Sequence, residues 1–129
     1  MNASAAIWTG RALSFLVVAF LLGASVVPKL MQARVATDTL QSLGWDARYT
    51  LMIGLIELGC IALYAIPRTS ILGAVLTTGL LGGALATQIR AESPLFSHVL
   101  FSVYLGLFLW GGLWLRDPSL RAVFPFRAI

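Results

Sequence analysis

The stretch IGLIELGCIALYAIPRT, residues 53–69, decides the fold because it is a long apolar run with a single carboxylate, Glu57, near its middle. The whole chain has a similar character, since 59% of its 129 residues are hydrophobic and 11% are charged. Soluble domains carry roughly 25% charged residues. A chain this short cannot bury so much apolar surface against itself in water. The sequence therefore predicts a membrane protein whose surface is largely solvated by lipid.

Three further segments are long and apolar enough to cross a membrane, which takes roughly 17–25 mostly apolar residues. A cleaved signal peptide is the alternative for the first of them, but its apolar run exceeds the roughly 7–15 residues typical of such peptides. We therefore predict an all-α fold, a four-transmembrane-helix bundle that forms a single integral membrane domain over residues 1–129. The predicted helices cover residues 10–31, 49–66, 70–90 and 94–116.

The connections between the predicted helices are short, with one exception. Proline and serine residues interrupt the apolar pattern at 67–70 and at 92–98, which indicates tight turns. The longer connection covers residues 31–48, in which Asp38 and Gln41 have the spacing of a capping box. We therefore expect a short interfacial helix between the first and second transmembrane helices.

The basic residues indicate how the chain is oriented. Four spans bring both termini to one side of the membrane, and five of the nine Lys and Arg residues flank that side. The positive-inside rule, which counts Lys and Arg in short loops, then predicts that both termini are cytoplasmic. The net charge of +4 indicates contact with anionic lipid headgroups and not with nucleic acid, because no basic stripe with interleaved aromatic residues occurs.

Glu57 lies too deep in its predicted helix to be hydrated. Counted from Thr50 at about 1.5 Å per residue, it lies about 10 Å inside the membrane. An acid at that depth costs a few kcal/mol, so Glu57 should face the bundle interior and be protonated or paired. The other three helices bring polar residues to the same outer half of the bundle. The sequence thus predicts a polar pocket there, with Glu57 and His98 as catalytic candidates and Lys29, Gln88 and Arg90 as ligand-binding candidates.

Each of these residues also has a structural interpretation. Lys29 and Arg90 can extend toward the headgroups, and His98 can lie at the edge of a loop. Glu57 can form an ion pair with Lys29 or Arg90 that only fixes the helix packing. Alternatively, a neutral His98 beside Glu57 can relay protons or orient a polar headgroup.

Other chemistry is poorly supported by the residue types. Glu57, Cys60 and His98 could together bind a metal ion, but we expect no metal site because buried cysteines usually pack as apolar residues. Cys60 is the only cysteine, which excludes disulfide exchange, a CxxC redox motif and iron–sulfur ligation within one chain. The single histidine likewise excludes bis-histidine haem ligation within one chain.

An ordered set of segments extends through nearly the whole chain: TGR (9–11), PKL (28–30), IGLIELGCIALYAIPRT (53–69), LGAVLTTGLLGGALATQIR (72–90), SPLFSHVLFSVYLG (93–106) and LWLRDPSLR (113–121). In order and spacing these segments resemble the DoxX-like family of small bacterial four-helix membrane proteins. The resemblance implies a four-helix bundle in the bacterial cytoplasmic (inner) membrane. The wider group is associated with quinone-linked sulfur oxidation and with membrane complexes that handle oxidative stress. The resemblance implies that the polar positions of the family pattern correspond to Lys29, Glu57, Arg90 and His98 in this chain.

Two functional hypotheses follow, and they leave open whether the chain is an enzyme. In the first, the polar pocket binds a lipophilic small molecule such as a quinone, whose carbonyl accepts a hydrogen bond from His98 or Arg90 while Glu57 handles the proton. The protein would then be an oxidoreductase or its membrane subunit. In the second, it is a non-catalytic scaffold or assembly subunit with Glu57 in a structural ion pair. Its glycine-rich helix faces would then pack against a partner protein or a second copy in a homodimer.

Overall fold

The computed structural model of the protein describes residues 2–127, and within them it is built from helices and contains no strand. Four helical spans in this part of the chain are long and apolar enough to cross a membrane. This confirms the predicted all-α bundle of four transmembrane helices. The spans cover Ala3–Leu30, Ala47–Ala65, Pro67–Arg90 and Leu95–Arg116.

Several of these spans are composed of more than one helical element. The first span consists of α1 (Ala3–Leu21), the π-helical turn η1 (Leu22–Val26) and α2 (Val27–Leu30). The second consists of the 3-10 turn η2 (Ala47–Tyr49) and α4 (Thr50–Ala65), and the third of the 3-10 turn η3 (Pro67–Thr69) and α5 (Ser70–Arg90). The fourth contains the π-helical turn η4 (Leu95–Val99) and α6 (Phe101–Arg116). Two short helices, α3 (Arg34–Ser42) and α7 (Pro118–Val123), complete the fold.

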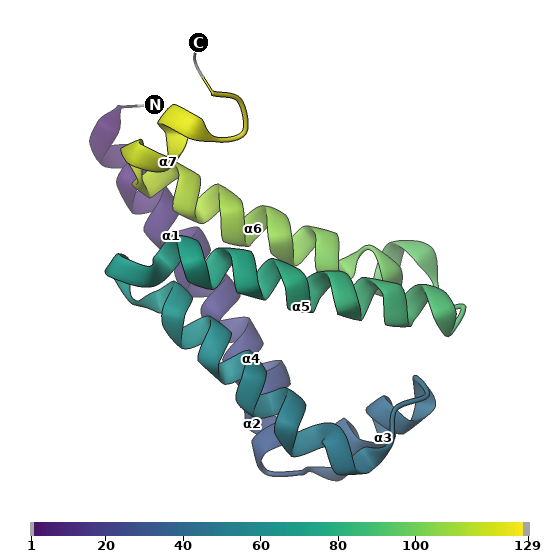
Figure 1. The fold of residues 1–129 in the computed structure, drawn as a ribbon. Coiled ribbons are helices and arrows are strands. Elements are labelled where there is room, and N and C mark those ends of the chain that lie inside the picture. Colours follow the sequence, from purple (N-terminus) through teal and green to yellow (C-terminus); the bar gives the residue numbers. More distant parts are fainter. Residues whose placement is uncertain (1, 128–129) are drawn as a thin grey trace.

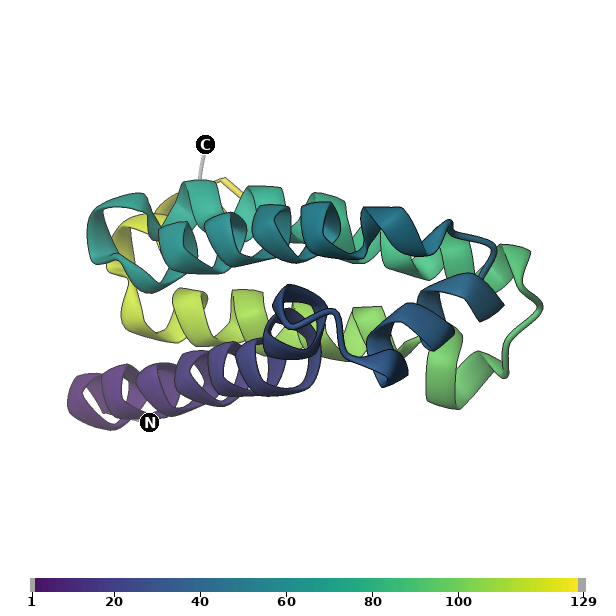
Figure 2. The same cartoon turned by 90° about the horizontal axis from the view of Figure 1, so that it is seen from below.

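The long helices converge at one end of the bundle and separate toward the other (Figure 1). The beginning of α1 and the short helix α7 lie together at the convergent end, which we call the terminal end. From there α2 and α4 form one arm and α5 and α6 form a second arm that points away from it (Figure 1). In the perpendicular view α6 lies between α1 and the α4–α5 pair (Figure 2), in agreement with the contacts of α6 with α1 and α5.

The convergent end contains the tightest packing because glycines allow the helices to approach closely. A Cβ atom at Gly10 of α1 would lie 2.6 Å from the carbonyl oxygen of Gly112 in α6. A Cβ atom at Gly73 of α5 would overlap the backbone of Tyr64 in α4. The buried core follows these contacts and consists of Val17, Leu21, Val26, Ile61, Tyr64, Ala74, Leu109, Leu113 and Leu120. Many large apolar side chains outside this core are exposed, as expected for a surface solvated by lipid.

The π-helical turn η1 ends two residues before Pro28, and the proline explains it. Pro28 has no N–H group, so it cannot donate to the carbonyl four residues back. The chain accommodates this by a π turn, in which the N–H of Val27 donates to the carbonyl of Leu22, five residues back. The first transmembrane helix therefore continues beyond the proline to Leu30 instead of ending there.

Two details of the helix ends differ from the sequence-based expectations. The first helix begins at Ala3 and not near residue 10, because the side chain of Asn2 caps it by accepting a hydrogen bond of 2.7 Å from the N–H of Ala5. The helix α3 occurs between the first two spans as predicted, but the capping-box prediction was wrong. Its N-cap is Ala33, so Asp38 lies in the middle of the helix.

Candidate functional site

Glu57 lies in the middle of α4 and forms an ion pair with Lys29 at the end of the first span. The Nζ atom of Lys29 donates a hydrogen bond of 2.9 Å to Oε2 of Glu57. The same Nζ donates to Oγ of Ser25 at 2.5 Å. Glu57 is 9% exposed. The deep carboxylate is thus paired with a cation and sheltered between two helices, which is one of the two states that its depth requires.

Local structure explains why these two side chains meet. Ser25 belongs to the π-helical turn η1, and Lys29 follows four residues later, one turn further along the same helix. On the other side of the contact, Gly54 lies one turn before Glu57 in α4. A Cβ atom at Gly54 would lie only 2.8 Å from Cβ of Lys29, so the glycine lets α2 approach α4. The ion pair therefore spans the interface between α2 and α4.

The other three predicted site residues lie in or near the second arm. His98 is exposed in η4, and its Nδ1 shares a hydrogen bond of 2.7 Å with Oγ of the neighbouring Ser97. Arg90 is exposed at the end of α5, with its guanidinium group close to Gly44 in the connection after α3. Gln88 is half-buried, and its Oε1 is buried without a hydrogen-bond partner.

The structure therefore brings together two of the five predicted residues. Among residues 2–127, no hydrogen bond or ion pair joins Glu57 or Lys29 to Gln88, Arg90 or His98. The physical reason is the divergence of the two arms, because helices that separate cannot bring residues at equal depth into contact (Figure 1). Within the same described range, no group of three His, Cys, Asp or Glu residues could hold a metal ion, so Glu57, Cys60 and His98 are not gathered either.

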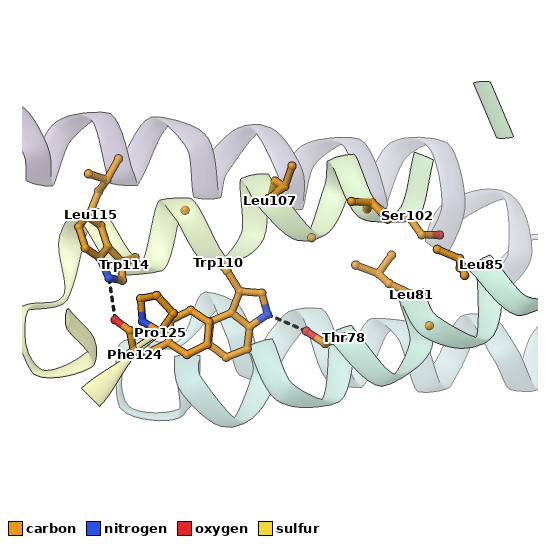
Figure 3. Close-up of a pocket in the computed structure, with 14 residues that line it drawn as sticks. Thr78, Leu81, Leu85, Ser102, Leu107, Trp110, Trp114, Leu115, Phe124 and Pro125 are labelled. Carbon is orange, nitrogen blue, oxygen red and sulfur yellow. Dashed lines mark hydrogen bonds between the residues drawn. The ribbon is translucent and has the colours of Figure 1, made fainter. Parts of the chain in front are cut away.

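A large cavity lies elsewhere, between α5 and α6, and has a volume of about 720 Å³ (Figure 3). We call it the α5–α6 groove. Its walls are mostly apolar, and glycines on both helices leave its centre open. The lining residues are Thr78, Leu81, Gly82, Leu85, Ser102, Val103, Gly106, Leu107, Trp110, Gly111, Trp114, Leu115, Phe124 and Pro125.

Two indole rings form one end of the α5–α6 groove, and hydrogen bonds hold both of them (Figure 3). Nε1 of Trp110 donates to Oγ1 of Thr78 at 2.8 Å, which connects α6 to α5. Nε1 of Trp114 donates to the carbonyl oxygen of Phe124 at 2.9 Å, which ties the chain after α7 to α6. The ring of Phe124 stacks on Trp110 with 4.9 Å between the ring centroids. The groove thus ends at a fixed aromatic surface.

Comparison with protein-family models gives a match to the DoxX-like family over residues 12–112, which is more than half of the chain. The chain belongs to the DoxX-like family. Together with the four apolar spans, this makes it a multi-pass membrane protein. Comparison with curated proteins gives no match. Comparison with solved structures gives none either.

The matched region of this DoxX-like protein contains the Lys29–Glu57 pair and most of the α5–α6 groove. Sequence reasoning missed the groove as a site. The sequence feature that could have indicated the groove is the set of glycines in the third and fourth spans, such as Gly82 and Gly106. Glycines in transmembrane helices are usually interpreted as sites of close helix contact. In the structure a Cβ atom at either position would meet no atom within 4 Å.

Proposed function

We propose that this DoxX-like protein binds a lipophilic small molecule from the membrane in the α5–α6 groove, and that a quinone is the class of ligand it takes. The groove itself carries the proposal. Its volume of about 720 Å³ lies within the roughly 300–1,000 Å³ of typical ligand pockets, which are likewise apolar with a few polar groups. An apolar groove within a membrane span favours a molecule that is already dissolved in the bilayer.

Two features of the groove favour a ligand with a flat, carbonyl-bearing ring. The stacked rings of Trp110 and Phe124 present an aromatic surface, against which a planar ring can stack. Toward the other end lies Ser102 (Figure 3), whose hydroxyl takes part in no hydrogen bond among the described residues. This hydroxyl can donate to a ligand carbonyl, since a polar group in apolar surroundings gains from finding a partner.

The Lys29–Glu57 pair has a structural role in this proposal. Neither Lys29 nor Glu57 lines the α5–α6 groove, and each charge is already satisfied by the other across the α2–α4 interface. Removing either partner would leave a charge without compensation in apolar surroundings. We therefore assign the pair to fixing α2 against α4 and leave no proton-transfer step to Glu57.

We also propose that the protein lies in the bacterial inner membrane with both termini cytoplasmic. The excess of Lys and Arg on the terminal side supports this orientation. A homodimer or a larger membrane complex is proposed on a separate ground. A Cβ atom at Gly79 or at Gly83 of α5 would meet no atom within 4 Å, so a helix of a partner can approach there.

Filling the groove with a side chain tests the ligand proposal. Gly106→Leu places an isobutyl group in the groove, and its Cβ atom meets nothing within 4 Å. Gly59→Leu is the matched control, since Gly59 is an equally open glycine of α4 that does not line the groove. Binding of decylubiquinone to the purified protein is measured by quenching of tryptophan fluorescence, because Trp110 and Trp114 lie in the groove.

We expect saturable quenching in the wild type and in Gly59→Leu, and an affinity about tenfold lower in Gly106→Leu, a loss equivalent to about 1.4 kcal/mol. Circular dichroism and gel filtration check that both variants keep the fold. Equal affinities of the two leucine variants, or a wild type whose quenching does not saturate, would contradict the proposal.

A further inference from the structure

The terminal end of the bundle contains a second polar cluster, formed by Ser14 of α1, Tyr64 of α4 and Arg116 of α6. Tyr64 is 1% exposed and Ser14 is 8% exposed. The hydroxyl of Tyr64 donates to the carbonyl oxygen of Leu109 at 2.6 Å, so it accepts from Oγ of Ser14, which lies 2.8 Å away. Nε of Arg116 in turn donates to Oγ of Ser14 at 3.1 Å. Three transmembrane helices are thus connected by one chain of hydrogen bonds.

The chain of hydrogen bonds fixes the guanidinium group of Arg116. Its central carbon lies 5.6 Å from the centre of the Tyr64 ring, within the range of a cation–π contact. The close approach of α1 and α6 at Gly10 and Gly112 holds the two helices at this distance, because a Cβ atom at Gly112 would lie 2.5 Å from Oγ of Ser14. With Nε engaged, the two terminal nitrogens of Arg116 have no protein partner among the described residues.

A cavity of about 200 Å³ lies against this cluster, which is room for several water molecules. Arg11 and Arg116 both line it, together with Ser14, Phe15, Val18, Tyr64 and Ala65. No acidic residue is among the lining residues. Two cationic side chains therefore face one small cavity.

Neither arginine has a carboxylate partner within the described part of the chain. The ion pairs found there join Lys29 to Glu57 and Arg48 to Asp46. Asp117 follows Arg116 directly, but its side chain caps α7 by accepting from the N–H groups of Ser119 and Leu120. Two positive charges that face one cavity repel each other, and an anion between them would offset that repulsion.

We propose that this cavity binds the phosphate group of an anionic ligand. The guanidinium fork matches phosphate oxygens geometrically, and Arg116 is held in place by contacts that use only one of its nitrogens. Arg116 is the last residue of α6, and the indole of Trp8 lies 5.0 Å from the guanidinium carbon of Arg11. Tryptophans and helix ends of this kind mark the headgroup level of a membrane. The phosphate therefore belongs to a lipid headgroup or to a soluble phosphate compound, and both present the same group to the two arginines.

The test compares two exposed arginines at the same end of the bundle. Arg11→Gln removes one charge from the cavity, and Arg68→Gln removes one from the turn η3, which lines neither cavity. Binding of phosphatidylglycerol is measured by native mass spectrometry of the detergent-solubilised protein. Binding of inorganic phosphate is measured by thermal shift against chloride at equal ionic strength.

We expect the wild type and Arg68→Gln to bind the phosphate probe equally, and Arg11→Gln to bind it about tenfold more weakly. Binding of phosphatidylglycerol alone assigns the site to a lipid headgroup, and binding of inorganic phosphate assigns it to a soluble phosphate. Arg11→Gln is used for the test because Arg116→Gln would also remove the hydrogen bond to Ser14 and could lower the stability of the fold. A wild type that binds neither probe overturns the proposal, as does an Arg11→Gln variant that binds as tightly as Arg68→Gln. The groove variant Gly106→Leu should leave this binding unchanged, so the two sites are tested separately.

Discussion

The ammonium group of Lys29 and the carboxylate of Glu57 lie 2.9 Å apart across the interface of α2 and α4. Lys29 also donates to Ser25, so the pair is supported by a third polar atom within apolar helices. An arrangement of this kind stabilises one register of the two helices, because sliding or rotating either helix separates the charges. Its contribution can be measured as a coupling between the two residues.

Glu57→Gln should lower the free energy of unfolding by about 3 kcal/mol, because the ammonium group of Lys29 loses its counter-charge in a buried position. Denaturation in mixed micelles measures this loss. The double variant Lys29→Met with Glu57→Met should recover a large part of it, since neither charge is then left unpaired. If the loss of unfolding free energy in the double variant equals the sum of the losses in the two single variants, the structural role of the ion pair is contradicted. Quinone binding in the α5–α6 groove should be the same in Glu57→Gln as in the wild type.

Ser102→Ala and His98→Ala should have different effects on quinone binding. Ser102 lines the groove, so removing its hydroxyl should weaken decylubiquinone binding by about threefold to tenfold, as expected for one hydrogen bond. His98 is exposed and bonded only to the neighbouring Ser97, so its replacement should change neither affinity nor stability by more than about 0.5 kcal/mol. Fluorescence titration of both variants measures the difference. A selective loss in His98→Ala would return the ligand to the pocket predicted around Glu57.

Tyr64→Phe should destabilise the terminal end of the bundle. It removes a hydroxyl that donates to the carbonyl of Leu109 and accepts from Ser14, both in buried positions. Leaving these partners unsatisfied should cost about 1–3 kcal/mol, measured as a lower thermal midpoint in detergent. Tyr104→Phe is the control, because the exposed Tyr104 hydroxyl donates only to the carbonyl of Phe96. Equal midpoints of the two variants would show that the buried hydrogen-bond chain contributes little.

The helical architecture could be predicted from the sequence because the membrane determines it. A span must be apolar over a fixed length, and this requirement is visible in composition alone. Helix ends were harder to predict, since they depend on single side chains. Asn2 extends the first helix by capping it, whereas Asp38 has the spacing of a cap but lies inside α3.

The candidate site could be predicted only in part. Depth along each helix is readable from the sequence, and it suggested that Glu57 needs a partner, which the structure supplies in Lys29. Depth does not give the direction in which a side chain points or the angle between helices. Arg90 and His98 therefore remain exposed in an arm that diverges from Glu57.

The two cavities escaped prediction for a related reason. The cluster at the terminal end joins Ser14, Tyr64 and Arg116. Along the sequence, Ser14 is 50 positions from Tyr64 and 102 positions from Arg116. The crossing of α1 and α6 at Gly10 and Gly112 brings Ser14 next to Arg116, and Tyr64 reaches Ser14 from α4. The α5–α6 groove likewise depends on how two helices are spaced, and glycines are equally compatible with a close contact and with an open space.

The extra residue in the π-helical turn η1 sets the rotational phase between the two ends of the first transmembrane helix. Arg11 precedes this turn and Lys29 follows it. A regular α-helical path through the same residues would shift the azimuth of Lys29 relative to Arg11 by about 100°, the rotation of one residue. The π turn therefore lets one transmembrane helix contact α6 with its first half and α4 with its last turn.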